Sequence, residues 1–457
     1  MVRFARLVST AAAWFGLIIV LLVVPVMAQS APAAVHAPES SQSPQPPTAT
    51  SQTSQAGDAG QAYHLPPDKL EKAKTLNRIR LALDISGAIW GLAVLWLLLA
   101  TRAVAALASW TERVSRRAWI QGVLFFVALT VITSLAAMPL DAMGHAASVH
   151  YGIGIQRWPG WLGDQAKGLG LSVAVGTWVL LLFNLLVRRS PRRYWIWAWA
   201  ISIPLILAAV FVTPVIIDPL FNKFEPLSKT HPALVGRLQQ VVARTGTQIP
   251  NERMFLMKAS EKTNAVNAYV TGIGATKRFV MWDTTTDRLP DDEVLFIFGH
   301  ESGHYQLHHI AKGLAISFVG ILIMFWACAR VGEWLVRRNG SRWGADSIAS
   351  RPGFVALLFT VSIAGFLATP LSNTMSRAIE HEADVYGQEA VHGLVPDPQK
   401  TAVSGFNHLG EISLDDPNPS PLVEFWMYSH PSVQHRATFA AHYDPWANGG
   451  RGRFFAK

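Results

Sequence analysis

Residues 294–304 read VLFIFGHESGH, an apolar run that ends in two histidines four positions apart. Residues 290–292, Pro-Asp-Asp, precede the run and are typical of a helix N-terminus, so we predict one helix through both parts. On such a helix His300 and His304 lie on the same face, on consecutive turns. Two imidazoles in this arrangement can bind one metal ion, and Glu301 lies beside it.

Glu301 is placed to act on a water molecule at such a metal. A carboxylate there can take a proton from the water and later pass it to a leaving amine. A catalytic zinc ion of this type has three protein ligands and one open position. The five-residue motif arises by chance in roughly a few per cent of chains of this length, so a second motif has to support it.

The second motif is SRAIEHEAD, residues 376–384. Glu380 and Asp384 lie one helical turn apart, which suits a carboxylate ligand followed by an acid that orients a ligating imidazole. The alternative interpretation of the two motifs is a pair of solvated polar helix faces. We favour a metal site because the pair of motifs is far more specific than either motif alone.

Other side chains near these motifs could compete for the metal. His381 and Glu382 are turned roughly 100° and 200° away from Glu380 on a helix, so Glu380 remains the predicted ligand. We interpret His308 and His309, one turn beyond the first motif, as structural residues or as partners of the ligands. Cys328 is the only cysteine and lies in an apolar run, which excludes an intramolecular disulfide and a cysteine-based metal site.

The composition of the 457 residues indicates a membrane protein: 50% are hydrophobic, 15% are charged and the mean hydropathy is +0.25. The formal net charge is +9, but the arginines form short clusters beside apolar runs and make no continuous basic face. We therefore predict a lipid bilayer and no nucleic acid as a partner. The expected fold is mainly α, a helical membrane protein of several spans with an inserted α+β zinc-metallopeptidase domain.

The chain begins with features of an export signal. Arg3 and Arg6 precede an apolar stretch over residues 8–26, and residues 26–28, Val-Met-Ala, are typical of a cleavage site. Residues 1–28 are therefore a signal peptide or an N-terminal anchor. Residues 29–63 are rich in Ala, Pro, Ser and Gln and are predicted to be a disordered linker.

The rest of the chain divides into four predicted parts. Each apolar run is near the roughly 20 residues that a spanning helix needs. Strands are expected near residues 254–257, 267–271 and 279–282, and a helix over residues 231–244. The parts are a membrane region, 64–217, with four spans (about 81–100, 119–140, 169–187 and 194–217); a metallopeptidase insert, 218–312; two further spans within 313–371; and a C-terminal catalytic part, 372–457.

Arginine clusters predict the orientation of the spans. They occupy three loops that alternate along the chain, near residues 102–117, 188–193 and 330–342. The positive-inside rule makes these loops cytoplasmic and leaves the catalytic residues on the opposite side. An export signal of this style suggests a bacterium, so we predict an inner-membrane protein whose active site faces the periplasm.

With these motifs the sequence resembles a known family, the membrane zinc metalloproteases of the CAAX prenyl protease, with bacterial HtpX as a shorter relative. The resemblance covers most of the chain after residue 63. It includes the HExxH and ExxxD motifs, which are typical of gluzincin-like peptidases. Further matching segments are YGI at 151–153 with WLGD at 161–164, PLFNKFEPL at 219–227, NAY at 267–269, and HP at 430–431 with Arg436.

The resemblance implies a role for each matching residue. His300, His304 and Glu380 would bind one zinc ion, Glu301 would be the general base, and Asp384 would support a histidine ligand. The strand containing Asn267, Ala268 and Tyr269 would pair with a polypeptide substrate in extended form. His430 and Arg436 would stabilise the oxyanion or hold the catalytic carboxylates.

The sequence departs from the family pattern in two respects. Ser432 replaces the second proline of the family's His-Pro-Pro motif, which affects the local turn and leaves His430 in place. In the eukaryotic relatives the site is reached from the cytosol, whereas the arginine clusters here predict the exported side.

Three classes of function are compatible with a metal-binding membrane protein. The first is an endopeptidase that hydrolyses membrane-associated, unfolded or prenylated polypeptides. The second is a transporter or channel with a structural metal; no predicted span carries paired charges inside the membrane, which argues against it. The third is a catalytically inactive scaffold. The complete set of predicted catalytic residues argues against an inactive scaffold and favours the endopeptidase: His300, Glu301, His304 and Glu380.

Overall fold

The structure, a computed structural model, describes residues 62–272 and 277–455. Six helices in this part of the chain are long and apolar enough to cross a membrane, and each contains one predicted span. The predicted signal at 1–28 and the linker up to residue 61 lie outside the described residues. The six are α2 (Pro67–Ala100), α4 (Ala118–His150), α5 (Trp158–Arg189), α6 (Tyr194–Val212) with its continuation to Phe221, α12 (His309–Trp343) and α13 (Arg351–Ala390).

The outer surface of these helices is apolar. In each of the six helices, at most 33% of the most apolar 18-residue stretch is buried inside the protein. Leu135, Ile323 and Leu367 are among the large apolar side chains that remain more than half exposed. A soluble protein does not leave so much contiguous apolar surface in water, so the helix surfaces are suited to lipid.

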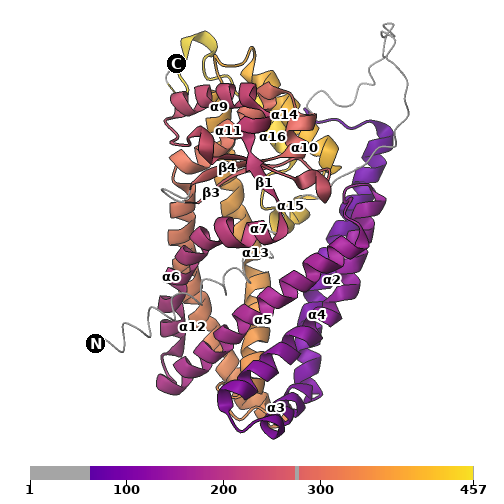
Figure 1. The fold of residues 1–457 in the computed structure, drawn as a ribbon, viewed down its shortest axis with the longest axis vertical. Helices are drawn as coiled ribbons and strands as arrows, with labels where there is room; N and C mark the ends of the chain where they lie inside the picture. Colours follow the sequence, from indigo (N-terminus) through magenta and orange to yellow (C-terminus); the bar gives the residue numbers. More distant parts are fainter. Residues whose placement is uncertain (1–61, 273–276, 456–457) are drawn as a thin grey trace.

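The two ends of the helical bundle differ in character. At one end lies the short helix α3 (Ala103–Val114), which packs in one apolar cluster with the end of α5 and the beginnings of α6 and α13. The arginine-rich loops lie at this end, far from the sheet and the C-terminal helices (Figure 1). Helix α13 runs the whole way from this end into the opposite end, which carries the two motifs at 300–304 and 376–384 and is called the catalytic end after the prediction made for them.

A four-stranded sheet forms part of the catalytic end. Its strands are β1 (Phe224–Pro226), β2 (Met254–Met257), β3 (Ala268–Thr271) and β4 (Arg278–Trp282), in the spatial order β1-β2-β4-β3. β2 and β4 are parallel, and the other two pairs are antiparallel. The sequence predicted β2, β3 and β4 but not β1, because three residues that end in a proline show no alternating pattern. β3 is an edge strand.

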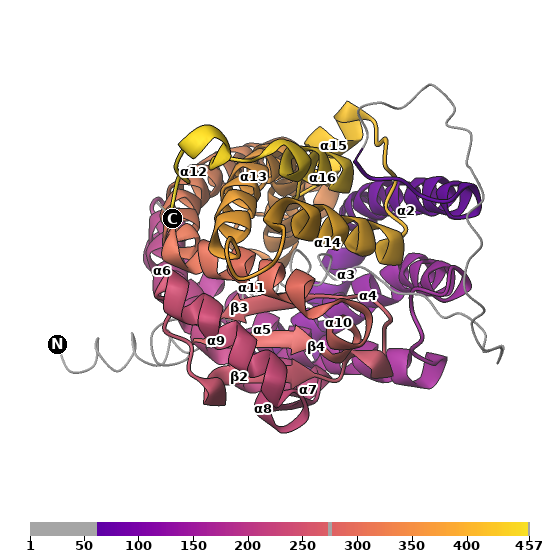
Figure 2. The same ribbon diagram turned by 90° about the horizontal axis from the view of Figure 1, so that it is seen from above.

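Helix α11 (Asp291–Gln306) is central in the catalytic end. It packs against β3, against α9 (Pro232–Thr245) and against the last turns of α13. Phe279 of β4 meets Phe298 of α11 edge to face, and Phe296 of α11 meets Phe406. The remaining helices are α7 (Asp218–Phe221), α8 (Leu227–Thr230), α10 (Asp283–Arg288), α14 (Pro398–Ser413), α15 (Pro421–Met427) and α16 (Val433–His442) (Figure 2).

Tyr63 belongs to this core although the predicted linker extends to it. Its side chain is fully buried against Gly410 of α14. Its backbone N–H donates to Gln434 Oε1 at 2.9 Å, and its hydroxyl donates to the carbonyl of Asp415 at 3.1 Å. Tyr63 is therefore packed although the composition places it in the predicted linker, and this residue ahead of α2 contacts the catalytic end.

Candidate metal centre

Helices α11 and α13 approach each other closely because glycines line their contact. A Cβ atom on Gly387 would lie 2.8 Å from the backbone nitrogen of His300, and one on Gly303 would lie 2.9 Å from Tyr386 Cβ. Neither position has room for a larger side chain. This close approach lets Glu380 of α13 reach the two histidines of α11.

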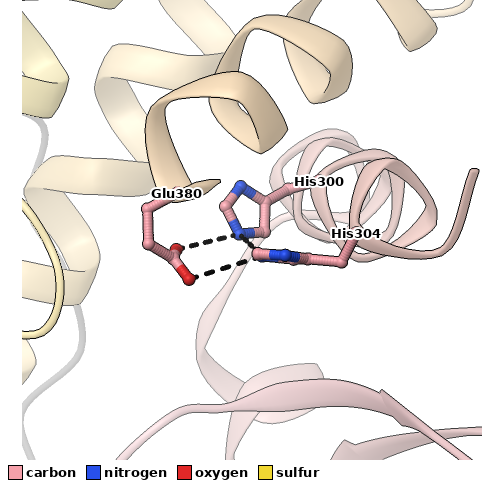
Figure 3. Close-up of side chains that lie close together, drawn as sticks. All are labelled: His300, His304 and Glu380. Carbon is pink, nitrogen blue, oxygen red and sulfur yellow. Dashed lines mark hydrogen bonds and ion pairs between the residues drawn. The ribbon is translucent and has the colours of Figure 1, made fainter. Parts of the chain in front are cut away.

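His300, His304 and Glu380 point toward one another (Figure 3). The two histidine Nε2 atoms are 3.0 Å apart, and the Glu380 oxygens lie 3.3 Å from His300 Nε2 and 3.4 Å from His304 Nε2. Tetrahedral ligands at zinc bond lengths are separated by about 3.3 Å. The Glu380 carboxylate is buried, and its two oxygens face the two histidine nitrogens. The group therefore fits a divalent cation.

The charges of the group also suit a cation. Burial lowers the pKa of His304 to about 3, which keeps the imidazole neutral and leaves one of its two ring nitrogens unprotonated and able to bind metal. Burial opposes ionisation of Glu380, but the hydrogen bond and charges of neighbouring histidines hold its pKa well below the usual range. Burial also lowers the pKa of His300, yet hydrogen bonds to Asp384 and Glu380 raise it to about 10. The negative charges of Asp384 and Glu380, which favour the protonated imidazole of His300, favour a bound metal ion in the same way.

Asp384 lies on the far side of His300 from the ligand group. Its Oδ1 is 2.8 Å from His300 Nδ1. Arg436 of α16 donates to both carboxylate oxygens of Asp384, at 2.9 Å and 2.6 Å. Asp384 therefore lies where a partner of a ligating imidazole is expected, and Arg436 contacts both carboxylates, since its Nη2 also lies 4.0 Å from Glu380.

Glu301 lies between the histidines and the sheet edge. The backbone N–H of Val270 in β3 donates to Glu301 Oε2 at 3.3 Å. Burial raises the pKa of Glu301 to about 7. A carboxyl group with a pKa near neutrality can both accept and return a proton, which is the behaviour required of a general base.

The predicted substrate strand is present as β3, but its residues play different parts. The backbone of Asn267 is already bonded: its N–H donates to Thr285 Oγ1 at 2.8 Å, and its carbonyl accepts from Trp282 at 3.0 Å. Hydrogen bonds alternate along an antiparallel strand, so the outward groups belong to Ala268 and Val270. Val270 cannot be identified from the sequence alone, because the direction of each backbone group depends on the register with β4.

His430 lies on the open side of the group. Its Nε2 is 3.5 Å from Glu380 Oε1, and about half of its side chain (49%) is exposed. The substitution of the family's second proline by Ser432 is accommodated locally. Ser432 accepts a hydrogen bond from the His435 N–H at the start of α16, and its own N–H donates to Glu424 at 3.0 Å.

Comparisons with known proteins agree with this arrangement. Residues 51–223 match the N-terminal region of CAAX prenyl proteases, described as five membrane helices, and residues 236–444 match peptidase family M48. The chain is 34% identical to an uncharacterized metalloprotease of Bacillus subtilis, YhfN, over 83% of this chain and 87% of that protein. It is 26% identical to CAAX prenyl protease 1 of Saccharomyces cerevisiae over 70% of this chain and 71% of the yeast protein.

The fold has a solved counterpart. The crystal structure of Saccharomyces mikatae Ste24p superimposes with a TM-score of 0.70 at 22% identity, covering 82% of this chain and 89% of that one. None of the comparisons supports a transporter or an inactive scaffold. Together, the two matched regions, the bacterial relative and the group of His300, His304 and Glu380 show that the chain is a membrane metalloendopeptidase of peptidase family M48.

Proposed function

We propose that this endopeptidase is zinc-dependent, with His300, His304 and Glu380 as the ligands and Glu301 as the general base. The observation that supports the proposal best is the convergence of three ligand atoms from two distant motifs, all within 4.8 Å of one another. Two imidazoles and one carboxylate form a ligand set typical of catalytic zinc. When bound, zinc lowers the pKa of water and polarises a carbonyl group.

The residues around the ligands divide the remaining work. Glu301 takes a proton from the attacking water at its carboxylate and returns it to the amine that leaves when the peptide bond breaks. His430, exposed beside Glu380, donates a hydrogen bond to the oxygen that becomes negative in the transition state. Arg436 is fully engaged with Asp384 and acts by positioning it.

A substrate binds in extended form along β3. The outward N–H and carbonyl of Ala268 and the carbonyl of Val270 offer the hydrogen bonds of a strand edge, and any polypeptide can match them. Val270 already donates to Glu301, so a substrate strand at this edge lies directly beside the general base. Membrane-associated polypeptides are the proposed class, because α13 carries Glu380 just beyond a membrane-spanning segment.

The catalytic end is proposed to face the exported side, the periplasm in a bacterium. The arginine-rich loops gather at the opposite end of the bundle, which the positive-inside rule assigns to the cytoplasm. Tyr63, which follows the predicted export signal, packs on the catalytic end. Reporter fusions after Asp218 and after Leu371 should both show export; a cytoplasmic reading at both positions would reverse the orientation.

The test of the chemistry compares purified wild type with Glu301→Gln. Zinc content and cleavage of an unfolded and of a prenylated peptide are measured for both proteins. The expected result is equal zinc in both and cleavage by wild type alone, with the two peptides showing which substrate class is preferred. Equal residual cleavage would remove Glu301 from its role, and wild type without zinc would overturn the ligand assignment.

A further inference from the structure

His304 has a second contact that the two motifs do not explain. Its Nδ1 lies 3.1 Å from Nδ1 of His309, the first residue of α12. The other nitrogen of His309, Nε2, lies 3.2 Å from Glu382 Oε2. His309 is only 4% exposed, so its imidazole nitrogens have these two partners in place of water.

Metal binding determines where the protons in this row must be. If His304 binds metal through Nε2, its neutral ring carries the proton on Nδ1 and donates it toward His309. His309 Nδ1 must then accept, which leaves the proton of His309 on Nε2, facing Glu382. Every donor meets one acceptor, and the terminal acceptor is a carboxylate. The row therefore favours the tautomer of His304 that can bind metal.

The backbone between α11 and α12 places His309 for this contact. His308, which separates the two helices, has a φ of 56°, in the left-handed region that residues other than glycine seldom adopt. This conformation ends α11 at Gln306 and starts α12 in a new direction. The side chain of His309 thereby meets the face of His304 that points away from the metal site.

Glu382 is in turn held by a segment from the far end of the chain. Arg453 Nη2 donates to Glu382 Oε1 at 2.8 Å. The backbone N–H groups of Arg453, Phe454 and Phe455 all donate to the fully buried carboxylate of Glu389, at 2.6 to 3.0 Å. Three successive amides on one carboxylate form an anion-binding turn, which holds the segment against α13.

Packing adds to this attachment. The rings of Phe454 and Phe455 lie 5.4 Å and 5.0 Å from the ring of Tyr386, the residue that contacts Gly303 beneath the ligand helix. A Cβ atom on Gly452 would lie 2.6 Å from Glu389 Oε2, so the turn requires glycine there. The position of Arg453 is therefore fixed by its neighbours and not only by its own ion pair.

We propose that His309 and Glu382, with Arg453 behind them, are positioning residues that hold His304 in the orientation and tautomer needed to bind the metal. This proposal rests on the proposed function of His304 as a ligand. The row His304–His309–Glu382–Arg453 is the counterpart of His300–Asp384–Arg436 on the other ligand. Second partners of this kind typically change metal affinity 10- to 100-fold when removed.

The test measures the zinc dissociation constant of the full chain in detergent by competition with a chelator. His309→Phe keeps the ring shape and removes both nitrogens, and it should weaken zinc binding about 10- to 100-fold. Glu382→Gln keeps an acceptor without its charge and should weaken binding less. The neighbouring variant His308→Asn is the matched control, because it removes an imidazole outside the row; it should bind zinc as wild type does.

Two further measurements separate positioning from a general structural effect. The thermal midpoint of the metal-free protein should stay the same in Glu382→Gln, and the visible spectrum of the cobalt-substituted protein should change in both row variants. Zinc affinities within twofold of wild type and unchanged cobalt spectra would overturn the proposal. If His309→Phe does not fold, Glu382→Gln decides by the same criteria.

The outcome for the row is distinguishable from the outcome for the ligands themselves. Glu380→Ala should abolish stoichiometric zinc binding if the proposed function is right. Loss of zinc in Glu380→Ala with normal zinc affinity in His309→Phe would reject only the row. Normal zinc affinity in Glu380→Ala would reject the ligand assignment instead.

Discussion

The two ligating histidines are supported by rows of different burial. Behind His300, the side chains of Asp384 and Arg436 are only 4% and 14% exposed. Behind His304, the side chains of Glu382 and Arg453 are 33% and 54% exposed. The two acids come from the same turn of α13, one on its inner and one on its outer side. Equivalent contacts should therefore have unequal energetic weight, because water screens the outer pair.

The largest effect is expected from breaking the inner row, His300–Asp384–Arg436. Arg436→Met removes the guanidinium and leaves the buried carboxylate of Asp384 without its bidentate partner. The free energy of unfolding should fall by about 3–5 kcal/mol, as measured by denaturant titration. The double variant Asp384→Leu with Arg436→Met serves as control: it should recover much of the stability but not the zinc affinity. Equal stability of Arg436→Met and wild type would contradict the importance given to burial.

Metal removal acts on both rows together. A chelator frees His300, His304 and Glu380, and the stabilisation that the metal provides is lost. With free zinc at 100 times its dissociation constant, the loss should be about 2.7 kcal/mol, and added zinc should restore it. Thermal unfolding with and without chelator checks this, with Glu380→Ala as the variant that should not respond. A chelator effect of the same size in Glu380→Ala would place the metal elsewhere.

The contact between the two ligand helices should be sensitive to a single methyl group. Gly387→Ala inserts a Cβ 2.8 Å from the backbone of His300, so α13 must move away from α11. The expected loss of stability is about 1–3 kcal/mol, together with weaker zinc binding, since Glu380 moves with α13. Gly365→Ala, where a Cβ has open space, is the matched control in the same helix. Equal stability and zinc affinity in the two variants would contradict the close approach.

The smallest effect on stability is expected from the outer row, His304–His309–Glu382–Arg453. Arg453→Gln removes one half-exposed ion pair, which should change the free energy of unfolding by less than about 1 kcal/mol. The same denaturant titration compares it with Arg436→Met. A loss as large as that of Arg436→Met would show that exposure does not distinguish the two rows.

The sequence predicted the membrane helices, most of the strands and the placement of the ligand group. These features leave local patterns: apolar runs of spanning length, and pairs such as Glu380 and Asp384 at helical spacing. Each predicted span lies within one of the six long apolar helices, but the apolar run does not give the limits of the helix, since α13 continues as a regular helix through polar residues to Ala390.

Other features had no local pattern from which to predict them. Tyr63 and Gln434 are far apart in the chain, as are Arg453 and Glu382, and no spacing rule connects such pairs. The sequence predicts His309 only as a structural residue or a partner of a ligand, because its contacts depend on the turn at His308. Val270 faces Glu301 because of the strand register, which requires the neighbouring strand to be known.

X-ray absorption at the zinc edge of the purified wild-type protein reads out the proposed ligand set of His300, His304 and Glu380 itself. We predict one zinc per chain with two imidazole nitrogens, the remaining ligands oxygen, and no sulfur. In Glu301→Gln the same ligands should be seen, since Glu301 is not one of them. A zinc ion with a sulfur ligand, one with a single imidazole, or a wild-type protein without zinc would contradict the account.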